Sequence, residues 1–214
     1  QARLRHRNVA ALLASGLTEK QEPFIAVELL RGKSLRGVIK VGRVAPVRAA
    51  SYAWQALQGL SAVHAQGILH RDLKPANIML EPSQGPVDRV VLIDFGFATF
   101  EGSAKLTLQG TVVGSLTYIA PERLRGEPTD ARADLSAIGV ILWELLMGAP
   151  PFRAEDDFDL IDLHVHEPAP HIDPSLPKAL DDVLLRALEK EPADRWPDAR
   201  SMAAALELAA QQIR

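Results

Sequence analysis

The chain begins with two short apolar segments that are separated by a polar turn. Leu12 and Leu13 form the first segment and residues 24–28 form the second, with the polar stretch 16–22 between them. Short apolar runs on either side of a turn are typical of antiparallel strands. The pattern therefore predicts a hairpin of two small strands.

A helical repeat follows from Tyr52 onward. Apolar or small residues and one histidine recur there at three- and four-residue intervals, at Ala53, Leu57, Leu60 and His64. Glycine readily adopts the left-handed conformation that ends many helices, so Gly67 is expected to lie where this one stops. The repeat predicts one long amphipathic helix.

Two further apolar runs, at 78–80 and 90–93, are short and lie among proline and glycine residues. This combination predicts two small strands, and the loops that they carry are expected to lie beside each other. Between Gly96 and Pro121 there is no sustained periodicity, which indicates a surface loop.

Helical patterns dominate the second half of the chain. Residues 138–147 are apolar on nearly every face and precede Gly148, which predicts a buried central helix with a firm end. A stripe of apolar residues over 180–188 predicts a second helix, and 203–213 a last one. The fold class expected from the whole pattern is α+β, mostly helical, with no internal repeat.

Composition excludes several classes of partner. The chain has 214 residues, of which 47% are hydrophobic and 24% charged, as expected for a soluble protein with one core. The net charge of -3 comes from intermingled signs, which predicts neither nucleic acid nor a membrane surface as a partner of this segment. Without cysteine there is no disulfide or thiolate metal site, so a cytoplasmic location is expected.

Two motifs in the middle of the chain carry chemistry. Residues 70–77 read His-Arg-Asp-Leu-Lys-Pro-Ala-Asn, and Asp-Phe-Gly follows at 94–96. Phosphoryl transfer from ATP depends on orienting the attacking hydroxyl and on neutralising phosphate charge with Mg²⁺ and cations. The motifs supply a carboxylate base, a phosphate-binding ammonium and two metal-binding groups, in Asp72, Lys74, Asn77 and Asp94 respectively.

With these motifs the chain resembles the eukaryotic-type (Hanks-type) serine/threonine protein kinases, nearly end to end. The resemblance implies ATP and Mg²⁺ as cofactors and serine or threonine hydroxyls of proteins as acceptors. In this family Asp72 would orient the hydroxyl or accept its proton, Lys74 would steady the phosphate, and Asn77 would hold Mg²⁺ with Asp94. Each residue alone is more commonly a turn, surface or capping residue, but the joint pattern argues against that interpretation.

The resemblance also assigns an adenine pocket. Val27 would occupy the gatekeeper position, and backbone groups of Glu28 and Leu30 would bond the base. Met79 would form the floor of the pocket and Ser34 would lie near the ribose. Plain core packing is the alternative for Val27 and Met79.

Structural roles follow for residues around the two motifs. His70 would pack beneath Phe95 and bond the backbone near the metal loop that Gly96 completes. Asp134 would accept backbone hydrogen bonds from the region of His70 and Arg71 and hold the catalytic loop rigid.

Residues 94–122 resemble an activation segment. Thr107, as the main site, and Thr111 could be phosphorylated and pair with Arg71, although an unmodified loop residue is the alternative.

At the end of that segment, Ser115 stands where the family usually has threonine and could bridge Asp72 and Lys74. Glu122 is expected to form a buried ion pair with Arg195 that anchors the loop.

In domain terms, residues 1–30 resemble the end of the kinase small lobe and its hinge, and 31–214 resemble the large lobe. The glycine-rich loop, the strand lysine and the glutamate of the regulatory helix are missing, so an N-terminally truncated fragment with little activity of its own is expected. A pseudokinase-like protein-binding scaffold is the alternative function. A small-molecule kinase is disfavoured by Ala-Pro-Glu at 120–122 together with Arg195. The composition suggests a bacterial source, and dimerisation for trans-autophosphorylation is a further expectation.

Two weaker signals carry no site. His164 and His166 are two residues apart on a predicted helix and point in different directions, which makes a zinc site improbable. The acidic cluster at 155–159 is expected to cap that helix and face water.

Overall fold

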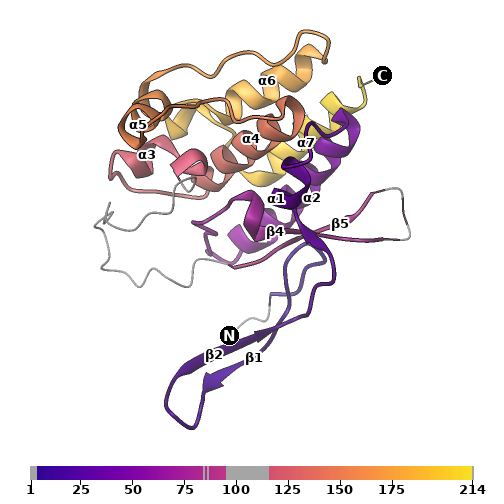
Figure 1. Ribbon diagram of the computed structural model, residues 1–214, viewed down its shortest axis with the longest axis vertical. Helices are drawn as coiled ribbons and strands as arrows, with labels where there is room; N and C mark the ends of the chain where they lie inside the picture. Colours follow the sequence, from indigo (N-terminus) through magenta and orange to yellow (C-terminus); the bar gives the residue numbers. More distant parts are fainter. Residues whose placement is uncertain (1–3, 84, 86, 95–115, 214) are drawn as a thin grey trace.

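The computed structural model describes residues 4–83, 85, 87–94 and 116–213. Its N-terminal part is an antiparallel hairpin of β1 (Leu12–Leu17) and β2 (Pro23–Val27), which projects away from a helical body (Figure 1). The predicted hairpin is therefore confirmed. Most of its apolar side chains remain exposed, for example Leu13 at 62% and Val27 at 48%, so the hairpin buries little apolar surface against the described residues.

A second, three-stranded sheet lies where the hairpin joins the body. Its strands are β3 (Lys33–Ser34), β4 (Ile78–Glu81) and β5 (Arg89–Leu92), in the order β3-β4-β5, and both pairings are antiparallel. β4 and β5 are the two strands predicted from the apolar runs. The N-terminal segment is fastened to this sheet because Leu92 N donates to Asn8 O at 2.9 Å and Ala10 N donates to Leu92 O at 2.9 Å.

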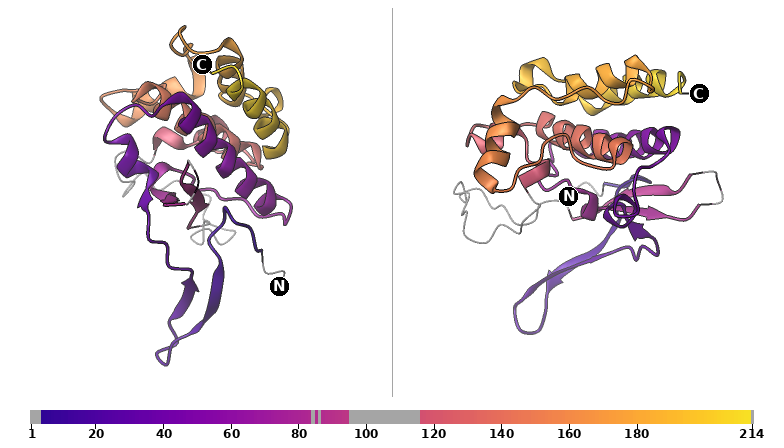
Figure 2. Two further views of the ribbon diagram at one scale, coloured as in Figure 1. Left: turned by 90° about the vertical axis from the view of Figure 1, so that its right-hand side faces the viewer. Right: turned by 45° about the horizontal axis from the view of Figure 1, so that its top comes forward.

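The helical body has two layers. Helices α6 (Lys178–Ala187) and α7 (Ala199–Ala210) cover α2 (Pro46–His64) and α4 (Arg132–Met147), which lie over the small sheet (Figure 2). The hydrophobic core is formed between these layers, with Leu57, Ile138 and Leu184 fully buried. This is the mostly helical α+β fold that the hydrophobic pattern predicts.

Short elements connect these helices. They are α1 (Leu35–Ile39), α3 (Pro121–Leu124), α5 (Asp157–His166) and the 3₁₀ turns η1 (Pro75–Asn77), η2 (Leu116–Tyr118) and η3 (Pro192–Asp194). Asp156 caps α5 by accepting a hydrogen bond from Asp159 N at 2.9 Å, as expected for the acidic cluster. Among the residues that the structure describes, no group of three or more His, Cys, Asp or Glu side chains is placed to hold a metal ion.

Three helices begin earlier than the apolar pattern indicates. α2 starts at Pro46, whose fixed φ and missing N–H suit the first turn of a helix. α7 starts at Ala199 because Asp198 caps it, accepting from Ser201 N at 2.7 Å. α4 starts at Arg132, and its first turns bury the polar residues Asp134 and Ser136, which a search for apolar periodicity passes over.

Glycines end α4 and allow it to pack closely. Gly148 has φ of +75° and terminates α4 as predicted, and Gly67 has φ of +70° just beyond the end of α2. Within α4, a Cβ on Gly139 would lie 3.0 Å from Ala187 Cβ, so this glycine lets α4 approach α6. Among the described helices, none is long and apolar enough to cross a bilayer.

Candidate active site

The three predicted catalytic residues converge on one carboxylate. Lys74 Nζ donates to both oxygens of Asp72, at 3.0 and 2.7 Å, and Asn77 Nδ2 donates to Asp72 Oδ2 at 3.0 Å and to Asp72 O at 2.7 Å. The Asp72 side chain is nevertheless 53% exposed, so a hydroxyl from another molecule can reach it. The site thus holds an accessible carboxylate, fixed in direction by a cation and an amide.

A tight turn brings these side chains together. Asp72 N donates to His70 O at 2.9 Å, and Asn77 N donates to Lys74 O at 2.9 Å, so the backbone folds back on itself twice within the motif. Pro75 begins η1 and fixes φ at the point where the chain turns towards β4. Arg71 adopts φ of +66°, a left-handed conformation that is uncommon for a residue other than glycine and often marks functional sites.

Asp134, at the start of α4, anchors this turn from below. Its Oδ2 accepts from His70 N at 2.9 Å and its Oδ1 accepts from Arg71 N at 3.1 Å, which are the contacts expected from the resemblance. His64 Nε2 lies 2.8 Å from the same Oδ2. Burial alone would raise the pKa of Asp134, but the hydrogen bonds from His64 and the two backbone donors outweigh it and lower that pKa. Asp134 is therefore a buried anion that fixes the catalytic loop.

His70 is a core residue of the loop. It is fully buried, and its Nε2 lies 3.0 Å from Ile93 O, one residue before Asp94. Burial lowers its pKa below the usual value for histidine, although Asp134 and the Ile93 carbonyl oppose the shift. The neutral ring donates to this carbonyl and ties the catalytic loop to the segment that follows β5.

The two predicted magnesium ligands lie at the ends of adjacent strands. Ile93 N donates to Asn77 O at 3.0 Å. This hydrogen bond holds Ile93, the neighbour of Asp94, beside Asn77, which directly precedes β4. The side-chain nitrogen of Asn77 donates to Asp72, so its Oδ1 is the side-chain atom left to accept a cation. Amide and carboxylate oxygens are hard donors that Mg²⁺ prefers, and this ion usually completes its shell with phosphate oxygens and water. The donor set therefore fits Mg²⁺. Asp94 is exposed and has φ of +56°.

The residues assigned to adenine lie in β2, β3 and β4 and in the segment that joins β2 to β3. Met79 and Ser34 are direct partners across β3 and β4, so the structure brings these two together. Val27 pairs with Leu12 at the end of β2 and is too exposed to belong to the described core. Glu28 N donates to Ala11 O at 2.9 Å, and Leu30 is half-buried two residues further on.

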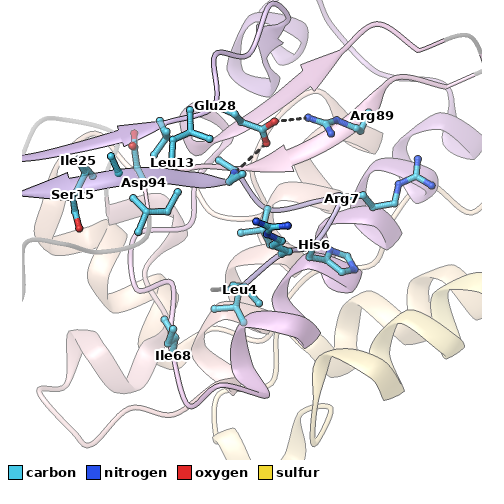
Figure 3. Close-up of a pocket in the computed structure, with 18 of the residues that line it drawn as sticks. Leu4, His6, Arg7, Leu13, Ser15, Ile25, Glu28, Ile68, Arg89 and Asp94 are labelled. Carbon is cyan, nitrogen blue, oxygen red and sulfur yellow. Dashed lines mark hydrogen bonds and ion pairs between the residues drawn. The ribbon is translucent and has the colours of Figure 1, made fainter. Parts of the chain in front are cut away.

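A cavity of about 1290 Å³ opens between the N-terminal segment, the hairpin and the loop after β5 (Figure 3). Of the predicted site residues that the structure describes, Val27, Glu28 and Asp94 line it. Asp72, Lys74 and Asn77 are not among its lining residues, and the nearest link to them is Asp94, whose neighbour Ile93 bonds Asn77 O.

The ion pair predicted between Glu122 and Arg195 is present and buried. Arg195 Nη1 lies 2.9 Å from Glu122 Oε1, and Nη2 lies 2.7 Å from Oε2, which is a bidentate arrangement. Arg195 also donates to the carbonyls of Glu189 at 2.7 Å and Lys190 at 2.9 Å. The pair joins α3 to the residue that directly follows η3. Phe95, Gly96, Thr107, Thr111 and Ser115 lie outside the described residues.

Two contacts of the catalytic loop were not predicted. His64 appeared in the sequence only as a member of an apolar stripe, although a polar residue in such a stripe needs a buried partner, and Asp134 is that partner. Arg123, from α3, donates to the carbonyl oxygen of Arg71. Because the partners of both residues are distant in sequence, spacing alone does not reveal them.

Comparison with known proteins identifies the class to which this fold and site belong. The protein kinase domain family matches residues 1–206. A protein of Corynebacterium glutamicum named probable serine/threonine-protein kinase PknB is 38% identical over 217 residues, which cover 95% of this chain and 33% of that protein. Serine/threonine-protein kinase PknH of Mycobacterium tuberculosis is 39% identical over 186 residues, covering 85% and 29%.

A third relative, serine/threonine-protein kinase pkn3 of Myxococcus xanthus, is 38% identical over 229 residues and covers 100% of this chain and 41% of that protein. The chain belongs to the protein kinase family, among bacterial Hanks-type serine/threonine kinases. It spans about a third of the length of the curated relatives PknB and PknH. The kinase resemblance drawn from the motifs is confirmed.

Proposed function

We propose that the protein transfers the terminal phosphate of ATP to serine and threonine hydroxyls of other proteins. The observation that carries this proposal is the convergence of Lys74 and Asn77 on the exposed carboxylate of Asp72. A carboxylate fixed in this way can orient an incoming hydroxyl and accept its proton as the phosphate is transferred. Lys74 would then bring its positive charge to the phosphate that is being transferred.

Asn77 and Asp94 are proposed to hold Mg²⁺. When bound, the ion would neutralise charge on the phosphates of ATP. The protein's own contribution is to keep the two ligands in register, through the hydrogen bond from Ile93 N to Asn77 O and the anchoring of His70 by Ile93 O. Val27, Met79 and Ser34 are proposed to surround the nucleoside, and backbone groups of Glu28 and Leu30 to bond the base.

A boundary at residue 30 between a small lobe with its hinge and the large lobe, a cytoplasmic location and dimerisation for trans-autophosphorylation are also predicted. Phosphorylation of Thr107, with Thr111 as a second site, is predicted to draw in Arg71 and to be detected by mass spectrometry of the active protein. An active protein without phosphate on Thr107 would contradict that assignment. A noncatalytic scaffold is not favoured, because Asp72, Lys74, Asn77 and Asp94 are all retained.

The proposal is tested by Asp72→Asn in the protein expressed from its complete gene. The amide keeps the size of the side chain but loses the charge and the ability to accept a proton, so kcat should fall by about 10²- to 10⁴-fold. Asp182→Asn is a matched control, since it removes an equally exposed carboxylate that pairs with Lys178 on the surface of α6. Phosphorylation of a general protein substrate by the Asp72 variant at the wild-type rate, with the control unaffected, would refute the proposal.

A further inference from the structure

Arg89 lies at the start of β5, next to the segment that runs from the hairpin to the helical body. We define the crossing segment as residues 28–32, between the end of β2 and the start of β3. One nitrogen of Arg89, Nη2, lies 3.5 Å from Glu28 Oε2 and 2.9 Å from Glu81 Oε2. Figure 3 shows the Glu28 carboxylate turned towards Arg89. A single guanidinium therefore holds two carboxylates together.

The two carboxylates hold the two ends of the crossing segment. At the first end, Glu28 Oε1 accepts from Ala11 N at 3.2 Å, while Glu28 N donates to Ala11 O at 2.9 Å. At the other end, Glu81 Oε1 accepts from Arg31 N at 3.0 Å. Arg89 thus reaches residue 28 directly and residue 31 through Glu81.

The end of the crossing segment is also fixed by close packing. A Cβ on Gly32 would lie only 1.7 Å from Leu80 O, so this position fits against β4 only without a side chain. Between the anchors, Leu29 is 82% exposed and Leu30 is half-buried. Within the described part of the chain, the backbone groups of these two residues make no hydrogen bond to the rest of the protein. Their direction therefore depends on the anchors at residues 28 and 31.

We infer that Arg89 is a positioning residue for recognition of the nucleotide base. This inference rests on the proposed function, in which backbone groups of Glu28 and Leu30 bond adenine. Arg89 touches neither the base nor the phosphates in this account. It sets the distance and direction of the backbone groups that do, by balancing the charges of Glu28 and Glu81. Without it, two carboxylates that shared one cation would repel each other, and the crossing segment would be ordered only when nucleotide binds.

The test is Arg89→Met in the protein expressed from its complete gene, with ATP and GTP as competing donors. Partly exposed ion pairs are worth up to about 1 kcal/mol each, so KM for ATP should rise about three- to tenfold. Because the catalytic loop is untouched, kcat at saturating ATP should stay within about twofold. The preference for ATP over GTP should narrow, since a loosened backbone distinguishes the purine edges less well. Arg89→Lys keeps one charge and should recover part of the lost affinity.

Two further sets of variants separate positioning from a general loss of stability. Arg125 also bridges two glutamates, Glu127 at 2.9 Å and Glu191 at 3.2 Å, with a similar side-chain exposure. Arg125→Met should therefore cost similar stability without changing KM for ATP or the ATP/GTP preference. Glu28→Gln and Glu81→Gln each remove one arm of the contact and should each raise KM for ATP by less than Arg89→Met. They also report on the inference if the Arg89 variant does not fold.

The outcomes are distinct. Unchanged KM for ATP and unchanged purine preference in Arg89→Met and in both glutamine variants overturn the inference, provided that Asp72→Asn is inactive. An equal fall of kcat for both nucleotides that tracks lowered thermal stability, with no recovery in Arg89→Lys, also overturns it, because that is the signature of a merely structural role. Full activity of Asp72→Asn would instead overturn the proposed function itself.

Discussion

Replacement of Arg195 by methionine would leave the carboxylate of Glu122 buried without its cation. The Arg195 side chain is 0% exposed and that of Glu122 is 1% exposed, so no solvent can take over the role of the guanidinium. Removing one partner from a buried pair of this kind typically costs about 3–5 kcal/mol, because the remaining charge is uncompensated. The carbonyls of Glu189 and Lys190 lose a charged donor as well. For a domain of this size, 1 kcal/mol corresponds to about 2–4 °C, so the midpoint of thermal unfolding should fall by about 6–20 °C.

A double variant shows whether the stranded charge is the cause. In Arg195→Met with Glu122→Leu the carboxylate is also removed, and much of the lost stability should return, because apolar replacements of buried pairs are often close to neutral. The assay is denaturant unfolding of the single and double variants at pH 7. A loss of less than about 1 kcal/mol in the free energy of unfolding of Arg195→Met would show that the pair is not a buried anchor. The same conclusion would follow if the loss in the double variant equalled the sum of the losses in the two single variants.

Two other predictions follow from buried polar groups. Burial, together with the charge of Lys190, lowers the pKa of His164 to about 4. Between pH 6.5 and 4 only the unfolded chain binds a proton at this residue. The free energy of unfolding should therefore keep its full value above pH 6.5 and fall by up to about 3 kcal/mol as the pH drops from 6.5 to 4. The midpoint of thermal unfolding should differ less between pH 7 and pH 5 in His164→Gln than in the wild-type protein. His166→Gln is the exposed control. The same pH response in His164→Gln and in the wild-type protein would refute the assignment. Asp134→Asn should lower kcat by about tenfold or more, since an amide presents only one oxygen to three donors, His64, His70 N and Arg71 N. Steady-state kinetics with wild-type kcat in this variant would show that the catalytic loop does not depend on Asp134.

Elements with one dominant periodicity could be predicted from the sequence. The apolar runs at 78–80 and 90–93 appear in the structure almost where the pattern places them, and the apolar helix ends at Gly148 as the pattern predicts. The starts of α2 and α4 could not be predicted in that way. Pro46 and Asp134 contribute through fixed backbone geometry and through hydrogen bonds to distant residues, and neither effect produces an apolar repeat.

The residues of the candidate site likewise include some that the sequence reveals and some that it does not. Asp72, Lys74 and Asn77 lie within six residues, so a local turn suffices to bring them together, and the motif reveals them. His64 supports the loop through a partner 70 positions away, and the contacts of Arg89 with Glu28 arise across 61 positions. Such contacts depend on how the helices and strands pack. They become visible only when the packing is known.

Asp94 tests most directly whether this site transfers phosphate from MgATP to protein hydroxyls, as proposed. The measurement is transfer of labelled terminal phosphate from ATP to serine and threonine of a protein substrate, by the wild-type and Asp94→Asn forms of the complete protein, with Mg²⁺ and with a chelator. Metal-dependent phosphoserine or phosphothreonine formed by the wild-type protein alone is the predicted result. Transfer that survives both the Asp94 substitution and the chelator would contradict the account.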